Sequence, residues 1–148
     1  MTREEVKRHL REYQSAIESL DTARRNLEAV ENQLTGISID YSQERVTSSA
    51  ISFDRIGDQV DQLAELRQTF EERKKRAIYL MIVAVRLINL CQNARGYDLL
   101  SRRYLHGKTW DELESEMHYS FRHLLRIHAD AIDEIARRCQ VQEHEERE

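Results

Sequence analysis

Two arginines four residues apart give the clearest chemical signal in this sequence. Arg122 and Arg126 lie in a segment with helical periodicity, so their side chains share one helix face. The guanidinium fork of arginine donates paired hydrogen bonds to a guanine edge or to a phosphate. The spacing therefore favours contact with a nucleic acid, and two ordinary solvated arginines are the alternative interpretation.

The other reactive residue types form no catalytic or metal-binding pattern. His118, His123 and His128 are five residues apart and do not share a helix face, which argues against a metal site. Cys91 and Cys139 lie far apart and outside any CxxC motif, so we expect two reduced thiols. Because no nucleophile–base pair, phosphate loop or pair of carboxylates is present, we expect neither enzymatic activity nor a cofactor.

Composition predicts an all-α fold. The 148 residues include no proline and only four glycines, which suits long helices and not a turn-rich β fold. The net charge of −4 counts against a nucleic-acid binder. The local charge differs in sign from the net charge of the chain, because residues 67–103 hold nine basic side chains against three acidic ones. Since the local field decides phosphate contact, this stretch can support DNA binding, although the run Glu72–Arg76 suits a solvated helix face better.

Two long helices with heptad spacing are predicted in the N-terminal two thirds. The first covers residues 2–34, with Thr2 as its N-cap, and the second covers Asp54–Cys91. The stretch 35–52 between them lacks periodicity and is expected to be a connector. The first seam is Val6, Leu10, Tyr13, Ile17, Leu20, Leu27 and Leu34, and the second is Ile56, Val60, Leu63, Phe70, Ala77, Met81, Ala84, Ile88 and Cys91. The pattern leaves open whether these helices pair with each other or with a second copy.

Three shorter helices are predicted after a break at Asn93–Gly96. They cover Tyr97–Leu105, which closes at His106-Gly107, then Trp110–Met117 and Phe121 to about Arg138. Thr109 with Glu112 forms the capping-box pattern of the second, and Ser120 is expected to cap the third. The acidic tail 141–148 is expected to fray.

The last two helices have the layout of a helix-turn-helix. The predicted inner faces consist of Trp110, Leu113, Met117 and Tyr119, and of Leu124, Ile127, Ala131 and Ile135. Phe121, Arg122, Leu125, Arg126 and Ala129 are left on the outer side. In this motif the second helix enters the major groove, and its N-terminal residues contact base edges.

The segment from Leu99 to Ile135 resembles sigma-factor region 4. The residues that match the family pattern are Leu100, Arg103, Tyr104, Gly107, Thr109, Trp110, Glu112, Leu113, Ser120, Leu124, Ile127, Ala131 and Ile132. With the segment Ser52–Leu66 and the coiled-coil arm, the chain is similar to the ArpU/RinA-type late-gene regulators of Gram-positive phages. His118 departs from the pattern, because glycine is common in that turn, and Asp130 stands where a basic residue is common.

This resemblance implies a transcriptional activator that reads double-stranded promoter DNA. The expected DNA contacts are Arg102, Arg103, Lys108, Thr109, Ser120, Phe121, Arg122, His123, Leu125 and Arg126. Because binding by one copy is expected to be weak, the expected partners are a second copy, through the coiled coil, or RNA polymerase. A phage small-terminase-like DNA-packaging subunit and a coiled-coil structural adaptor remain alternatives.

The expected organisation has four segments. Residues 1–53 form the coiled-coil arm and connector, 54–96 the second helix, 97–140 the helix-turn-helix domain and 141–148 the tail. The longest apolar run, Ile78–Leu90, is too short for a membrane span and contains Arg86, and the N-terminus lacks a signal peptide. We therefore expect no membrane partner and a cytoplasmic location, in a bacterial host of a phage or prophage as the resemblance implies.

Overall fold

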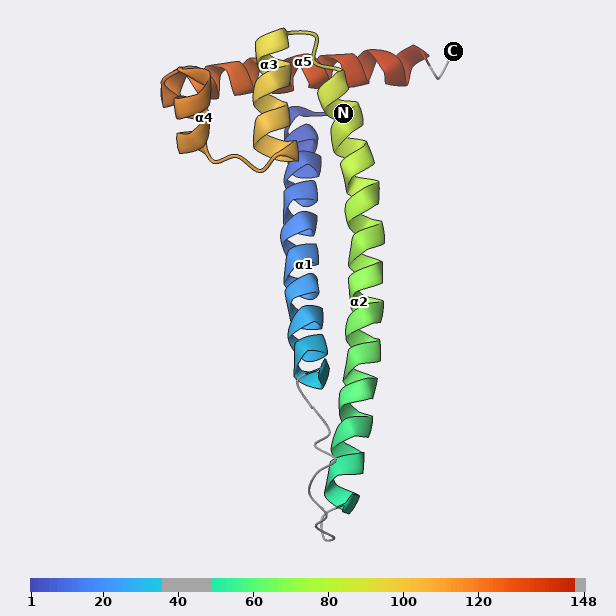
Figure 1. Ribbon diagram of the computed structural model, residues 1–148. Coiled ribbons are helices and arrows are strands. Elements are labelled where there is room, and N and C mark those ends of the chain that lie inside the picture. Colours follow the sequence, from blue (N-terminus) through green and yellow to red (C-terminus); the bar gives the residue numbers. More distant parts are fainter. Residues whose placement is uncertain (36–48, 146–148) are drawn as a thin grey trace. The chain divides into compact units, whose positions relative to one another are not determined.

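The computed structural model describes residues 1–35 and 49–145, and this part of the chain is all-α without a strand. The elements in chain order are α1 (Arg3–Thr35), α2 (Ser49–Asn89), α3 (Ala94–Leu100), the π-helical turn η1 (Ser101–Leu105), α4 (Trp110–Met117) and α5 (Phe121–Glu145) (Figure 1). The predicted fold class is therefore confirmed at the level of an all-helical chain. Within the described residues, no helix combines the length and the apolar character that a bilayer span requires.

Several predicted helix ends are wrong. Helix α2 begins at Ser49 instead of Asp54, in a stretch with no glycine or proline to stop it. It ends at Asn89 instead of Cys91, because the N–H groups of Leu90 and Cys91 donate to carbonyls three residues back. Helix α5 continues to Glu145, past the predicted end at Arg138 and into the predicted frayed tail. Most of the predicted connector lies outside the described residues.

The chain divides into two compact units that cut across the predicted segments. The first unit joins Met1–Ile17 with Ala77–Glu148, and the second covers Glu18–Arg76. Within the second unit α1 and α2 pair antiparallel, since Arg67 Nη2 lies 3.3 Å from Glu31 Oε1 and Arg73 Nη1 donates to the Ser19 carbonyl at 3.0 Å. In this unit the two long helices therefore pair within one chain.

The heptad seams are only partly buried. Val6, Leu10 and Tyr13 are buried as predicted, whereas Ile17 is 42% exposed. On α2 the seam positions Val60 and Met81 are 52% and 41% exposed. In the first unit the buried residues of α2 are Ala77, Leu80, Ala84, Leu87 and Ile88, so the seam positions Ala77, Ala84 and Ile88 are buried as predicted.

The short helices pack around a small apolar cluster in the first unit. Leu99, Leu113 and Leu124, one from each of α3, α4 and α5, are fully buried. Trp110, Met117, Tyr119 and Ile127 pack against them and are partly buried. Ala131 and Ile135 extend the buried stripe along α5. The predicted inner faces of the two C-terminal helices are therefore confirmed.

Gly96 allows α3 and α5 to cross at very short range. The predicted break at Asn93–Gly96 is wrong, because the Asn93 side chain accepts hydrogen bonds from the N–H groups of Arg95 and Gly96 and starts α3 at Ala94. Gly96 lies inside that helix. A Cβ atom at this position would lie 2.8 Å from Ala131 Cβ and 2.9 Å from Cys91 Sγ. The glycine thus serves close packing, not a turn.

We expect Gly96→Ala to destabilise the fold by about 1–3 kcal/mol, because the added methyl group overpacks this crossing. Gly57→Ala is the matched control: a Cβ there meets nothing within 4 Å, so alanine should raise the free energy of unfolding by up to about 1 kcal/mol. Urea denaturation of both variants checks the contrast. Equal stability of Gly96→Ala and wild type would contradict the close crossing.

Candidate nucleic-acid interface

Helix α4, which precedes the turn to α5, is fixed by hydrogen bonds at both of its ends. Before α4, Thr109 Oγ1 accepts from the Glu112 N–H at 3.3 Å, and the Glu112 carboxylate accepts from the Thr109 N–H at 2.7 Å. After α4, His118 adopts the left-handed conformation (φ 56°, ψ 36°), and its N–H donates to the Glu114 carbonyl at 3.1 Å. The predicted capping box is confirmed, and His118 takes the positive φ for which glycine is common at this turn.

The N-terminus of α5 is capped by a serine and a carboxylate. The carbonyl of Ser120 accepts from the N–H groups of His123 and Leu124, and Ser120 Oγ accepts from the His123 N–H at 3.4 Å. The Glu114 carboxylate accepts a hydrogen bond from the Phe121 N–H. These bonds satisfy N–H groups that the helix itself leaves unpaired, and the negative charge suits the positive end of the helix dipole. The turn therefore links α4 firmly to the start of α5.

The outer face of α5 carries the two arginines that the sequence singled out. Arg122 and Arg126 are exposed, and within the part of the chain that the structure describes neither guanidinium has an ion-pair or hydrogen-bond partner. Phe121 and Leu125 beside them are 44% and 41% exposed. This face combines available cations with apolar side chains, which is the mixture that base edges and thymine methyl groups require.

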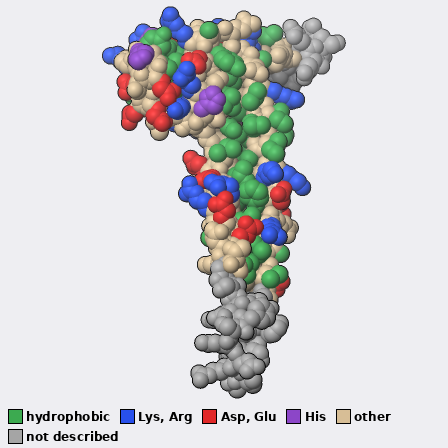
Figure 2. Space-filling view, viewed as in Figure 1, with side chains coloured by type: hydrophobic (Ala, Val, Ile, Leu, Met, Phe, Trp, Pro, Cys, Tyr) green, Lys and Arg blue, Asp and Glu red, His purple; other side chains and the backbone are tan. Residues whose placement is uncertain are grey.

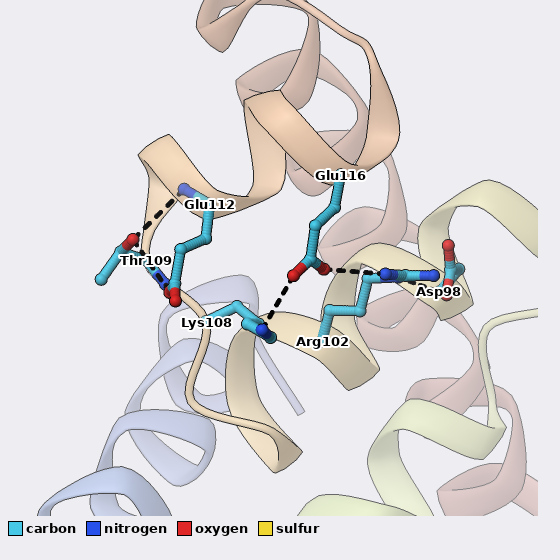
Figure 3. A network of polar contacts seen from close by, with 6 residues as sticks. All are labelled: Asp98, Arg102, Lys108, Thr109, Glu112 and Glu116. Atoms are coloured by element: carbon cyan, nitrogen blue, oxygen red, sulfur yellow. Dashed lines mark hydrogen bonds and ion pairs between the residues drawn. The ribbon is translucent and has the colours of Figure 1, made fainter.

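The other three predicted cations are engaged within the chain. Arg102 Nε lies 2.9 Å from Asp98 Oδ1, and its Nη1 lies 2.9 Å from Glu116 Oε2 (Figure 3). Lys108 Nζ lies 2.8 Å from the other oxygen of the same Glu116 carboxylate. Arg103 Nη1 donates to the Lys108 carbonyl at 2.7 Å, and the guanidinium lies 5.2 Å from the centre of the Trp110 ring.

Glu116 is the residue that sequence reasoning missed in this network. Its hydrogen bond from Lys108 is the largest cause that lowers the pKa of the Glu116 carboxyl, with a further contribution from Arg102 and against the opposing effect of burial. The carboxylate is therefore ionised at neutral pH and holds both cations. Phosphate oxygens would have to compete with Glu116 for Arg102 and Lys108.

The remaining predicted contacts have structural roles in the free chain. Thr109 and Ser120 are used as helix caps. The Phe121 ring packs edge-on against Trp110 with centroids 5.7 Å apart, and the His123 ring packs edge-on against Tyr119 at 4.8 Å. Among the ten predicted DNA contacts, Arg122 and Arg126 are therefore the two cations that are exposed and have no partner in the described part of the chain.

His128 forms a half-buried polar contact behind this interface. Its Nε2 lies 2.9 Å from the Tyr104 hydroxyl, and its ring lies 5.7 Å from that of Trp110. Burial, followed by the positive charges of Lys7, Arg103 and Arg11, lowers the pKa of His128 to about 4. Sequence spacing gave no signal for this role, because Tyr104 lies on a different helical element.

We expect acid to destabilise the fold through His128. The unfolded imidazole (pKa 6.5) binds a proton before the folded one (pKa about 4). The free energy of unfolding should therefore be highest above pH 6.5 and fall as the pH drops toward 4, by about 2 kcal/mol between pH 7 and pH 5. Urea denaturation at these two pH values checks this, and His128→Gln should lose most of the difference. If His128→Gln lost as much unfolding free energy between pH 7 and pH 5 as the wild type does, His128 would not be the group responsible.

Comparison with protein-family models, with curated proteins and with solved structures found no match to this chain. Both cysteines are buried, and burial, followed by the nearby Glu134 carboxylate, raises the pKa of the Cys91 thiol to about 11. Within the described ranges, no group of three or more histidine, cysteine, aspartate or glutamate side chains is arranged to hold a metal ion.

Proposed function

We propose that this protein is a sequence-specific DNA-binding transcriptional activator. In this proposal α4, the turn and α5 form a helix-turn-helix, and α5 is the recognition helix that enters the major groove of promoter DNA. The observation that carries the proposal is the pair of exposed, unpaired guanidinium groups of Arg122 and Arg126 on the outer face of α5. Other candidate cations nearby are held by carboxylates or by a carbonyl group.

The chemistry of that face fits base reading. Arg122 and Arg126 lie about one helical turn apart, so each can donate a bidentate pair of hydrogen bonds to a guanine. Phe121 and Leu125, both more than a third exposed, supply apolar contacts for thymine methyl groups. The buried cluster of Leu99, Leu113 and Leu124 holds α5 from behind, so the outer face is presented on a rigid support.

The resemblance to sigma-factor region 4 and to the ArpU/RinA-type regulators supports a more specific proposal. The protein would act at promoters of phage late genes, in the cytoplasm of a bacterial host that carries the phage or prophage. The left-handed His118 provides the tight turn that such a motif needs, and the capping box at Thr109 fixes the start of α4.

The charge around the recognition helix limits the affinity of a single copy. Asp111, Glu112 and Glu116 are exposed on α4, and Asp130 is exposed on α5. Figure 2 shows acidic side chains gathered on this end of the molecule. These groups repel phosphates, while the arginine pair attracts them. A second copy of the chain, or RNA polymerase bound next to it, would supply the missing affinity.

Arg122→Ala plus Arg126→Ala should weaken binding to the preferred duplex by at least about 30-fold, because each bidentate arginine–guanine pair contributes about 1–3 kcal/mol. The probe is the duplex that the wild-type protein selects from a random-sequence pool, measured over a series of salt concentrations. Lys74→Ala plus Lys75→Ala removes the same charge from an exposed part of α2 and is the matched control. Wild type without salt-dependent binding, or equal losses in the two double variants, would refute the proposal.

The homodimer that we propose would form through an exposed apolar face of α2. Ile78, Tyr79, Met81 and Ile82 are between 41% and 66% exposed and lie within about two helical turns (Figure 2). A two-fold axis would place this face against its own copy, as in most homodimers. The second copy is favoured as occupant because dimerisation would also bring a second pair of recognition arginines to the DNA.

Ile78→Glu plus Ile82→Glu should convert the dimer into a monomer and weaken DNA binding, since the buried apolar face would then carry charges. Sedimentation velocity over a concentration series measures the first effect. Val141→Glu introduces a charge at a 57% exposed position on α5 and serves as the control. Wild type that remains monomeric at every concentration would contradict the dimer but not the DNA contact.

A further inference from the structure

A pocket between α3 and α5 adjoins the exposed arginines. It has a volume of about 330 Å³, and its charged or titratable lining residues are Arg95, His123, Arg126, Asp130, Glu134 and Arg137. Arg95 comes from α3, whereas the other five come from α5. One of the two proposed base-reading arginines, Arg126, therefore lies at the same hollow as an arginine that is 31 residues earlier in the chain.

The carboxylates at this pocket do not cancel its positive charge. Glu134 accepts hydrogen bonds from the N–H groups of Gln92 and Asn93 and pairs with Arg138 Nε at 3.2 Å. It is thus occupied by groups other than Arg95 and Arg126. Asp130 is the second carboxylate at the pocket, against three arginines. The local balance therefore favours an anionic ligand.

Arg95 also borders the turn between α4 and α5. A second hollow, of about 260 Å³, is lined by Arg95 together with Met117 and Tyr119. Arg95 therefore flanks both the turn and the first part of α5. Its side chain is exposed, and among the described residues it has no ion-pair partner.

The backbone of Arg95 is held in place from two sides. Its N–H donates to Asn93 Oδ1 at 3.0 Å, and the next residue, Gly96, lies at the close crossing with Ala131. Only the side chain is left to adjust when a ligand arrives. A flexible cation on a fixed backbone, to the side of a recognition helix, suits a phosphate better than a base edge deep in the groove.

We infer that Arg95 binds a backbone phosphate of the DNA next to the bases read by Arg122 and Arg126. This inference rests on the proposed function and names a third contact of that interface. The phosphate would lie against the α3–α5 pocket within reach of Arg95, while Arg126 at the edge of the same pocket contacts a base. Such a contact positions α5 on the duplex and carries no sequence information of its own.

Arg95→Ala should lower affinity by a similar factor, about 3- to 10-fold, on preferred and on random duplexes, and should reduce the slope of log K against log salt by about 1. Base preference should not change. Arg95→Lys should keep the salt slope, because its charge remains. Arg86→Ala removes a charge from an exposed position on α2 and should leave both affinity and slope at wild-type values.

The outcomes separate this inference from the proposed function. If wild type shows no salt-dependent DNA binding, the proposed function fails and the Arg95 contact fails with it. If Arg122→Ala plus Arg126→Ala loses binding while Arg95→Ala keeps the wild-type affinity and slope, the Arg95 contact alone is wrong. Thermal denaturation of each variant establishes that the comparison is made between folded proteins, and Arg95→Gln replaces the alanine variant if that one unfolds.

Discussion

The short-range crossing of α3 and α5 at Gly96 and Ala131 determines the geometry of the C-terminal part of the chain. Without a side chain at Gly96, the two helix backbones come close enough for Leu99 and Leu124 to share one buried cluster with Leu113. Because α4 packs on the same cluster, the angle between α4 and α5 depends on this contact as well. The outer face of α5 is thus fixed by a packing constraint on its opposite side.

The distribution of charge follows from the same arrangement. Helix α4 lies where its Glu116 reaches Arg102 and Lys108, so two cations are neutralised at one carboxylate. Arg122 and Arg126 of α5 are exposed and form no ion pair with it or with another described residue. A chain with net charge −4 can therefore present a positive surface over a small area. Net charge alone is a poor guide to function here, because pairing decides which charges act on a ligand.

Local signals in the sequence predicted much of this architecture. The capping box joins Thr109 to Glu112 three residues later, and the inner faces of α4 and α5 follow from helical spacing. Such features depend on neighbours in the chain, so they are readable without a structure. Gly96 was misread for the same reason: a glycine after a polar residue resembles a break, and only the position of Ala131 explains its place inside a helix.

Contacts between distant segments could not be predicted in this way. Glu116 lies 14 residues from Arg102, and Arg95 lies 31 residues from Arg126, so no periodicity connects them. The predicted seams of the long helices are only partly confirmed. The predicted seam places Met81 inside, whereas Leu80 is the buried residue, so the heptad steps of three and four are kept but alternate in the other order from Ala77 onward.

Under the proposed function, the carboxylate of Glu114 would affect the direction from which DNA approaches α5. It already accepts the Phe121 N–H, so the start of α5 holds an anion of its own. A phosphate that comes toward this helix end-on meets a like charge where other helices offer free N–H groups, at a cost of about 1 kcal/mol or more at contact distance. A strand that approaches from the flank meets guanidinium groups instead. In the proposed DNA complex, the helix end would thus favour approach from the flank over approach end-on before any base contact forms.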